Sequence, residues 1–464
     1  MSREDGSSPA VAGDLFEGDY PDSRTDEERE RDRTVVLRQV RTLGTPVEPL
    51  VVDFPQLLQK RRGRADSGVV QFEIVPSQQG QDTFVAAGEI LVRPQRKDGA
   101  GADTVADGES ALERNGFARQ PGFDDCPELR GSVARFVRSG IDARELLEVV
   151  SQLRAEGQAA SLNHITPLAK IIKGLGGSEP SAATRTLVRT RTASAPTRVA
   201  VIDTGVAAEM RTDGWLSHAD IERRGDNIDE LDMFPAGGDR LLDFASGHGT
   251  FVTAVIQQVW PDADIRVYRA VDSDGVGTEF GVACAMIRAV REGAQILNLS
   301  VGSQTVDDGP PVALETALDV IETMDPEVLV VAAAGNNGDT RPCWPAAFRR
   351  VVAVAGLRND LTPASTWSSH GVWVDCSTIG EGITSPYVEG WESNLIDPDD
   401  PDHFGPNSWA VWTGTSFAAP QITGALARIC QERGHTPRQA LGWLLAQGVA
   451  VPNFGRAVRI LPGT

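Results

Sequence analysis

Asp203, His248 and Ser416 carry the side chains that nucleophilic catalysis needs, and each stands at the end of a predicted regular element. Asp203 directly follows the apolar run 199–202, while His248 and Ser416 each open a helical stretch. A serine hydroxyl attacks a carbonyl group when a histidine accepts its proton and a carboxylate orients that histidine. Taken singly, an aspartate before a glycine is typical of a turn, a lone histidine is usually structural, and a serine at a helix start is a common N-cap.

The sequence after residue 197 alternates short apolar runs with helical stretches. Continuous apolar runs of this length are typical of strands that are buried on both faces of a parallel sheet. The predicted strands are 199–202, 265–268, 296–299, 328–333 and 351–354, and the predicted helices are 249–259, 280–292, 312–324 and 416–432. We therefore predict an α/β fold with a doubly wound, mostly parallel sheet. Its carboxyl edge would gather the three side chains.

The chain before residue 197 divides into three parts by composition. Residues 1–67 are acidic and poor in large apolar side chains, so we expect a largely disordered segment with a short helix over about 26–43. Residues 68–172 predict a small α+β domain, and residues 173–196 an exposed linker before the main domain, 197–464. The elements expected in the α+β domain are strands 69–75, 84–92, 133–137 and 159–165, a helix near 110–114, and a helix from Asp142 to Gly157.

Three sequence motifs surround Asp203, His248 and Ser416. They are Val-Ile-Asp-Thr-Gly at 201–205, Gly-His-Gly-Thr at 247–250 and Gly-Thr-Ser-Phe-Ala-Ala-Pro at 414–420. Each occurs once, in the chain order Asp, His, Ser that subtilisin has. The motifs resemble those of the subtilisin-like serine peptidases, the subtilases. The resemblance covers about half of the chain and implies a subtilisin-like fold, in which Asp203 orients His248 and His248 activates Ser416.

The resemblance also implies an oxyanion donor and a substrate cleft. Within residues 333–338, the family's oxyanion asparagine corresponds to Asn336 rather than Asn337, although the segment alone is typical of an Asn-Asn-Gly turn. Residues 274–278 and 300–302 resemble the two strands that pair with an extended substrate backbone. The implied substrate-binding residues are Val276, Gly277, Ser300, Val301, Gly302, Ala333, Ala334, Gly335 and Cys343.

Two features depart from the family pattern. Cys343 stands before Trp344-Pro345 where many relatives have a glycine at the base of the pocket for the residue preceding the scissile bond. We expect a shallower pocket that prefers small or medium residues. An insertion over 390–408 carries four aspartates, which fit either a Ca²⁺ site or a solvated acidic loop. They are Asp397, Asp399, Asp400 and Asp402. We assign no metal ligand and expect no required cofactor.

Composition restricts the partners and the compartment. The 464 residues include 65 acidic and 44 basic side chains, for a formal charge of −21, which argues against nucleic acid or an acidic membrane surface as a partner. The five cysteines form no C-x-x-C pair, which favours a reducing compartment. No apolar signal segment and no membrane-spanning run is visible. We expect a soluble, cytoplasmic protein.

These observations favour a serine endopeptidase that acts on a protein or peptide. Two alternatives stay open: a peptide ligase or macrocyclase with the same triad, and a catalytically silent peptide-binding module. All four catalytic positions carry the residue that the family has there, which argues against the silent module. The N-terminal α+β domain loosely resembles a subtilase prodomain. It would then be an intramolecular inhibitor of a zymogen that cuts itself near the linker; otherwise it is a permanent accessory.

Overall fold

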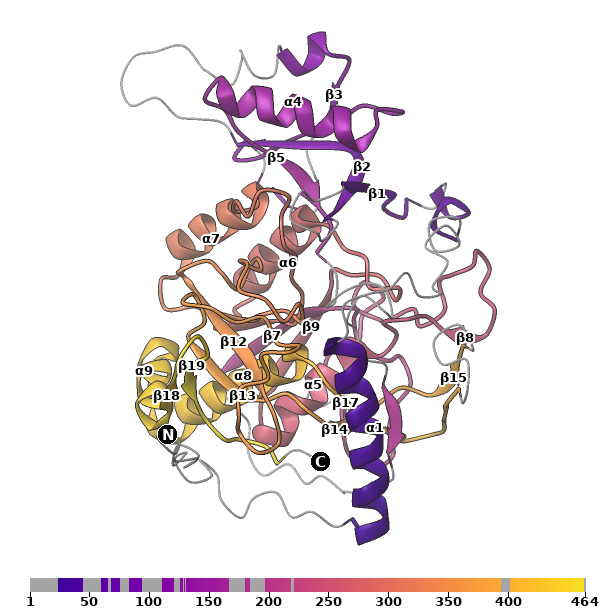
Figure 1. Cartoon of the computed structure of the whole chain (residues 1–464), viewed down its shortest axis with the longest axis vertical. Helices are drawn as coiled ribbons and strands as arrows, with labels where there is room; N and C mark the ends of the chain where they lie inside the picture. The colour runs from indigo at the N-terminus through magenta and orange to yellow at the C-terminus, as the bar shows by residue number, and fades with distance from the viewer. Residues whose placement is uncertain are drawn as a thin grey trace, which may run out of the picture.

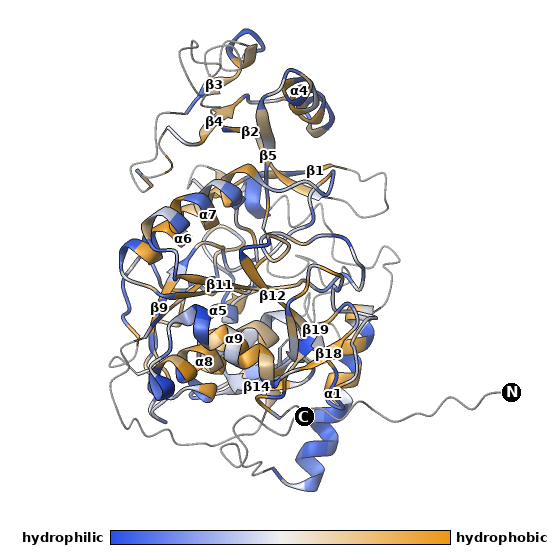
Figure 2. Ribbon diagram, turned by 90° about the vertical axis from the view of Figure 1, so that its left-hand side faces the viewer, coloured by the Kyte–Doolittle hydropathy of each residue, from blue (hydrophilic) through white to orange (hydrophobic). Residues whose placement is uncertain are grey.

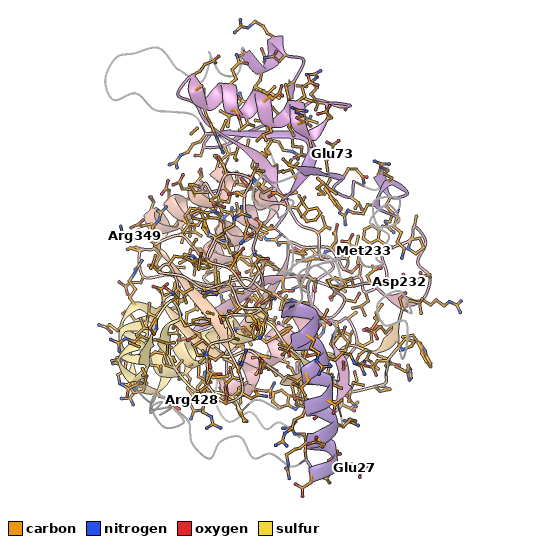
Figure 3. The ribbon with its side chains drawn as sticks, viewed as in Figure 1. Glu27, Glu73, Asp232, Met233, Arg349 and Arg428 are labelled. Atoms are coloured by element: carbon orange, nitrogen blue, oxygen red, sulfur yellow. The ribbon has the colours of Figure 1, made fainter. Side chains whose placement is uncertain are left out.

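The computed structural model describes most of the chain in full side-chain detail. The described residues are 24–44, 60–65, 68–75, 83–93, 111–120, 126–127, 129, 131–166, 180–183, 197–217, 221–393 and 401–462. None of the helices in these ranges is both long and apolar enough to cross a membrane. Side chains fill the space between the layers, and Glu27 and Glu73 lie in separate parts of the N-terminal region (Figure 3).

An eight-stranded sheet forms the centre of the main domain, in the order β18-β19-β13-β12-β11-β10-β7-β9. All neighbours are parallel except β18 and β19. The strands are β7 (Arg198–Asp203), β9 (Asp264–Arg269), β10 (Ile296–Leu299), β11 (Leu329–Ala333), β12 (Val351–Leu357), β13 (Cys376–Ile379), β18 (Val449–Val451) and β19 (Gly455–Ala457). The predicted α/β fold with a mostly parallel sheet is confirmed, and the five expected strands all lie within it.

Helices cover both faces of this sheet (Figure 1). Along β7, Val199 and Val201 pack into one core with α5 (His248–Val259) and α8 (Thr415–Arg433). Ala200 and Ile202 pack into the opposite core with α6 (Glu279–Arg291) and α7 (Val312–Met324). Because successive side chains of a strand point to opposite faces, a run that is buried on both faces must be apolar throughout. A further helix, α9 (Pro437–Gln447), packs against α8.

Strands and a helix of the chain before residue 167 pack together into a unit that is here called the α+β unit (the described part of residues 68–166). Its antiparallel sheet contains β1 (Phe72–Val75), β2 (Thr83–Arg93), β3 (Ala118–Arg119), β4 (Ala134–Val137) and β5 (Ala159–His164). The helix α4 (Ala143–Ala155) covers it with an apolar face that includes Leu146 and Val150. Asp142 caps α4 as the sequence predicts, because its carboxylate accepts the backbone N–H groups of Arg144 and Glu145. Figure 1 shows this unit above α6 and α7.

The predicted N-terminal helix is α1 (Asp26–Gly44), and it lies against the main domain. A capping box begins this helix, because Thr25 and Glu28 bond each other's backbone N–H groups. The half of α1 that begins at Asp26 is hydrophilic, whereas the other half carries the apolar residues that dock (Figure 2). Val40 and Leu43 pack there against Trp367 of the main domain.

Two small sheets lie beside the central one. The first has the order β14-β17-β6, with β14 (Ile383–Pro386), β17 (Trp409–Trp412) and β6 (Ser181–Ala183). Since β6 falls inside the predicted linker, the prediction that this segment is exposed is wrong for these residues: a short run of small residues pairs with an available strand edge. The second sheet, β16-β15-β8, joins β15 (Gly390–Glu392) and β16 (His403–Phe404) of the predicted insertion to β8 (Leu241–Leu242).

Candidate active site

Asp203 and His248 meet where β7 ends and α5 begins. Nδ1 of His248 lies 2.8 Å from Oδ1 of Asp203, and both side chains are buried. The backbone N–H of Thr204 also donates to that oxygen, at 2.8 Å. A carboxylate at Nδ1 selects the tautomer that carries its proton there, so that Nε2 is left to accept a proton. The pairing that the sequence predicts for these two residues is therefore present in the geometry.

A buried carboxylate, that of Asp229, bonds the neighbours of both Asp203 and His248 and so holds the two chain segments together. Asp229 accepts the hydroxyl of Thr204 at 2.7 Å and the backbone N–H of Gly247 at 2.9 Å. Burial raises the pKa of Asp229 to about 6. The glycine at 249 is required by a close approach of the same segments, because a Cβ there would lie 2.2 Å from the carbonyl oxygen of Gly205. Asp229 belongs to no motif, so no local sequence pattern predicts its position beside the pair.

Ser416 stands in the first turn of α8 and is buried. Its hydroxyl donates to the carbonyl oxygen of Ser300 at 3.2 Å. The next residue, Phe417, packs its ring 5.4 Å from the ring of His248, centroid to centroid. Trp412 packs edge-on against the same imidazole at 5.3 Å. Phe417 thus places the first turn of α8, with its free N–H groups, beside the predicted base. The Ser416 hydroxyl is bonded to Ser300 rather than to His248.

Asn336 follows β11 and is fixed by the residue that precedes Ser416. Its Oδ1 accepts both the backbone N–H and the hydroxyl of Thr415, each at 2.9 Å. With Oδ1 occupied, the two N–H bonds of Nδ2 are left to face the site, where Nδ2 lies 3.3 Å from the position that a Cβ of Gly414 would take. By contrast, Asn337 is held through its backbone N–H, which donates to the hydroxyl of Ser369 at 3.1 Å. This geometry suits Asn336, and not Asn337, to donate to an oxyanion.

The predicted cleft edge (residues 274–278) pairs with an extended segment of the chain's own N-terminal region. The backbone N–H of Thr166 donates to the carbonyl oxygen of Gly277 at 2.8 Å. Ile165 and Thr278 form an antiparallel bridge beside this bond. Gly277 and Thr278 thus pair with an extended segment, whereas the carbonyl oxygen of Val276 accepts the backbone N–H of Asp272 in its own turn.

The other predicted substrate-binding residues divide into two groups. Ser300 contacts Ser416 through both backbone and side chain, and Val301 is buried beside it. Ala333 and Ala334, in contrast, are buried in the hydrophobic cores, and the backbone N–H of Ala334 is bonded within the sheet. Their side chains belong to the core, so a substrate role for them would rest on the backbone alone.

Cys343 lies between two glycines of the predicted pocket. A Cβ at Gly302 or at Gly335 would lie 2.9 Å from its Sγ, so the sulfur fills the space that these glycines leave. Burial raises the pKa of the Cys343 thiol to about 12, which keeps it protonated and unreactive. The sulfur therefore fills the space between these two glycines, and the shallow pocket stays a prediction.

No group of three or more potential metal-ligating side chains gathers within the described ranges. Of the four aspartates in the predicted insertion, Asp397, Asp399 and Asp400 lie outside those ranges. Asp402 accepts the backbone N–H of Ala182 in β6 at 2.9 Å. This carboxylate therefore bonds the backbone of a neighbouring strand.

Comparisons with known proteins place this site in a family. A model of the subtilase family matches residues 195–448. A thermophilic serine proteinase from Bacillus sp. (strain AK1) is 30% identical over 244 residues, which are 50% of this chain and 52% of that protein. Thermitase from Thermoactinomyces vulgaris is 27% identical over 249 residues, 51% of this chain and 75% of that protein. The matched part thus spans only about half of the Bacillus proteinase.

The structure agrees with these sequence matches. The crystal structure of fervidolysin from Fervidobacterium pennivorans, a keratinolytic enzyme related to subtilisin, aligns with a TM-score of 0.54 and 18% identity. The alignment covers 81% of this chain and 60% of that chain, and at this identity it bears on the fold alone. Because the family model spans more than half of the chain and includes all four candidate site residues, the chain belongs to the subtilase family.

Proposed function

We propose that the protein is a serine endopeptidase in which Ser416 is the nucleophile. The observation that carries the proposal is the buried contact of 2.8 Å between His248 and Asp203, next to the helix end that presents Ser416. The Ser416 Oγ attacks the scissile carbonyl carbon, and its proton passes to Nε2 of His248. Asp203 holds the imidazole and stabilises the imidazolium that forms.

The tetrahedral intermediate needs donors for its oxygen. Nδ2 of Asn336 and the backbone N–H of Ser416 supply them, since Thr415 fixes the asparagine from the other side. His248 then gives its proton to the leaving amine, and water releases the acyl group by the reverse route. Asp203 and His248 are already paired, whereas the Ser416 hydroxyl donates to the carbonyl oxygen of Ser300 and must turn to Nε2 of His248 when substrate binds.

The proposal extends to the α+β unit as an intramolecular inhibitor. Thr166 occupies the cleft edge that a substrate strand would use. At the end of β5, Nδ1 of His164 lies 2.8 Å from Glu279, whose other oxygen accepts the backbone N–H of Ala313 at the start of α7. Glu279 thus joins the first turns of two helices to the α+β unit. A cut between Thr166 and Arg198 would release the constraint on this unit.

The decisive experiment compares the wild-type chain with Ser416→Ala and with the control Ser151→Ala, which changes an exposed serine of α4. The chains are incubated alone and with a peptide, and the masses of all termini and products are measured. We expect Ser416→Ala to stay full length and to lose activity by about 10⁶ in kcat, the loss found for the nucleophile of subtilisin itself. Ser151→Ala should behave as the wild type.

The same masses separate the alternatives. Hydrolysis adds one water across each cut, whereas ligation or cyclisation adds none. A wild-type chain that stays intact while it cuts the peptide would show that the α+β unit is a permanent accessory. A fluorophosphonate probe that leaves Ser416 unlabelled in every condition would contradict the proposed activity.

A further inference from the structure

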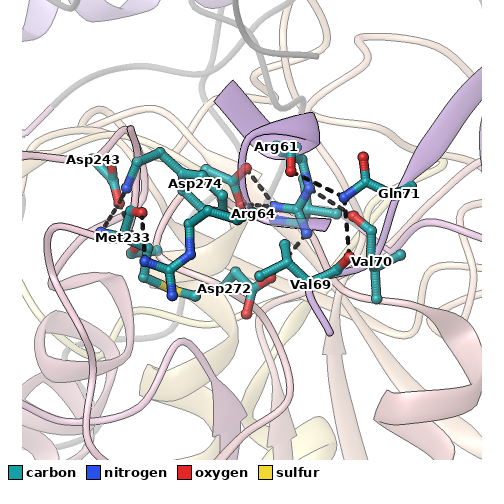
Figure 4. Close-up of polar contacts among 12 residues, drawn as sticks. Arg61, Arg64, Val69, Val70, Gln71, Met233, Asp243, Asp272 and Asp274 are labelled. Atoms are coloured by element: carbon teal, nitrogen blue, oxygen red, sulfur yellow. Dashed lines mark hydrogen bonds and ion pairs between the residues drawn. The ribbon is translucent and has the colours of Figure 1, made fainter. Parts of the chain in front are cut away.

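Arg61 reaches from the N-terminal region into the main domain and is buried there. Its Nη1 lies 2.6 and 2.5 Å from the two carboxylate oxygens of Asp274, and its Nη2 lies 2.9 Å from Asp272 (Figure 4). Its Nε donates to the backbone carbonyl of Val70 at 2.8 Å. The guanidinium also lies over the ring of Phe234, 5.1 Å from its centroid. Only 1% of the Arg61 side chain is exposed.

The two carboxylates are aimed by the backbone of the main domain. Asp272 opens a turn that is closed by its backbone bonds with Gly275 and Val276, at 2.8 and 3.0 Å. Oδ1 of Asp274 accepts the backbone N–H of Val276 at 3.2 Å. This turn leads directly into Gly277, which accepts the N–H of Thr166. Asp272 and Asp274 therefore lie in the turn from which the cleft edge starts.

The chemistry of this arrangement is selective for a planar cation. A guanidinium has three separate donor nitrogens, which here reach Asp274, Asp272 and Val70, and a flat face that stacks on an aromatic ring. An ammonium has one donor nitrogen and no flat face. A buried charge whose partner is removed is costly, so the two aspartates require a cation when the turn is covered. Arg61 supplies that cation from outside the main domain.

We propose that Asp272, Asp274 and Phe234 form a guanidinium-binding pocket at the cleft edge, and that Arg61 is its intramolecular ligand. The pocket holds residues 60–65, and with them the N-terminal region, on the turn from which the cleft edge starts. Whether this binding keeps the enzyme inactive rests on the proposed function, because the binding regulates activity only if the α+β unit is an inhibitor. The binding itself does not depend on catalysis.

The binding is tested by hydrogen exchange in the full chain with Ser416→Ala, in which no self-cleavage is expected. Arg61→Ala empties the pocket, and Arg62→Ala changes the exposed neighbouring arginine as a control. We expect Arg61→Ala to speed exchange of the amides at 271–278 by at least about tenfold, as the loss of one partner of a buried pair implies. Arg62→Ala should leave it unchanged. Millimolar ethylguanidinium should restore the slow exchange in Arg61→Ala, and ethylammonium should not.

The proposal is overturned if Arg61→Ala and Arg62→Ala exchange alike, or if the two small cations act equally. Should Arg61→Ala fail to fold, Arg61→Lys keeps the charge but loses the separate donor nitrogens, and exchange between that of the wild type and tenfold faster is expected. Exchange equal to that of the wild type would again count against the pocket.

Activity then tests the regulatory consequence in chains that retain Ser416. If the α+β unit inhibits, Arg61→Ala should shorten the lag before peptide hydrolysis at least about tenfold relative to Arg62→Ala. Equal lags in the two variants would contradict a role of the pocket in latency. The absence of any lag in the wild type would instead contradict the inhibitory function, while the exchange experiment would still report on the pocket.

Discussion

At the scale of single residues, each candidate reacting group is held by a second side chain: Asp203 bonds His248, and Thr415 bonds the amide oxygen of Asn336. Asp203, His248 and Asn336 each stand near the end of a strand or the start of a helix, and their motifs indicate them only together, through the resemblance to a family. Asp229 and Trp412 belong to no motif, because their roles depend on contacts with His248 and its neighbours that only the folded chain creates.

Replacing Asn336 tests the oxyanion assignment. Asn336→Ala should lower kcat by about 10²–10³, the cost measured for the oxyanion asparagine of subtilisin, with little change in KM. The matched control is Asn337→Ala, which changes the neighbouring asparagine that the sequence alone left nearly equivalent. Steady-state kinetics on one peptide decide the matter. Equal losses in both variants, or a loss confined to KM, would argue against an oxyanion role.

Replacing Cys343 tests the shape of the specificity pocket. Because Sγ fills the space beside Gly302 and Gly335, Cys343→Gly should deepen the pocket. We expect the ratio of kcat/KM for phenylalanine over alanine before the scissile bond to rise roughly tenfold or more, the scale that a methylene-sized change in an apolar pocket produces. Cys126→Ala, a buried cysteine of the N-terminal region, is the control. An unchanged ratio in Cys343→Gly would mean that the pocket lies elsewhere.

At the scale of elements, apolar periodicity predicts the central strands and helices but not the small sheets. The strands β7 and β10 are continuous apolar runs because both of their faces are covered. The strand β6 consists of three small residues, and its partner β17 lies hundreds of positions away along the chain. No local sequence pattern specifies the pairing of β6 with β17, and the composition of residues 173–196 therefore predicts a linker.

The docking of α1 gives a prediction at this scale. Gln39 is fully buried, and its amide bonds the carbonyl of Val411 at 2.9 Å and the hydroxyl of Thr413 at 2.8 Å. Gln39→Ala leaves both groups without this partner, which should lower the free energy of unfolding by about 1–3 kcal/mol. Leu37→Ala, which changes a side chain that is 58% exposed on the same helix, should stay within about 0.5 kcal/mol of the parent.

Denaturant unfolding in the Ser416→Ala background measures both variants without self-digestion. A loss for Gln39→Ala no larger than that for Leu37→Ala would show that α1 contributes nothing specific to the main domain. The sequence could not predict this contact, since a glutamine on a charged helix is typical of a solvated face.

At the scale of the whole molecule, buried carboxylates make stability depend on pH. Burial raises the pKa of Asp229 to about 6 and that of Asp243 to about 7, above the ordinary value of 3.8. A raised pKa in the folded state means that the folded chain binds the proton more tightly than the unfolded chain. The contribution to stability is therefore complete below about pH 4 and is lost as the pH rises through 6 and 7.

We accordingly expect the free energy of unfolding contributed by these groups to fall between about pH 4 and pH 8, in the same direction as the growing negative charge of the chain. Asp243→Asn mimics the protonated carboxyl and retains an acceptor for the bonds from Ser273 and Met233. Its loss of stability between pH 5 and pH 8 should be smaller than that of the parent, with Ser416→Ala in both chains. Glu113→Gln, which changes an exposed carboxyl of the N-terminal region, should leave the pH dependence unchanged. Thermal unfolding at each pH gives the comparison. Parallel curves for Asp243→Asn and its parent would mean that Asp243 stays ionised in the folded chain, because a group with the same pKa in both states contributes no slope.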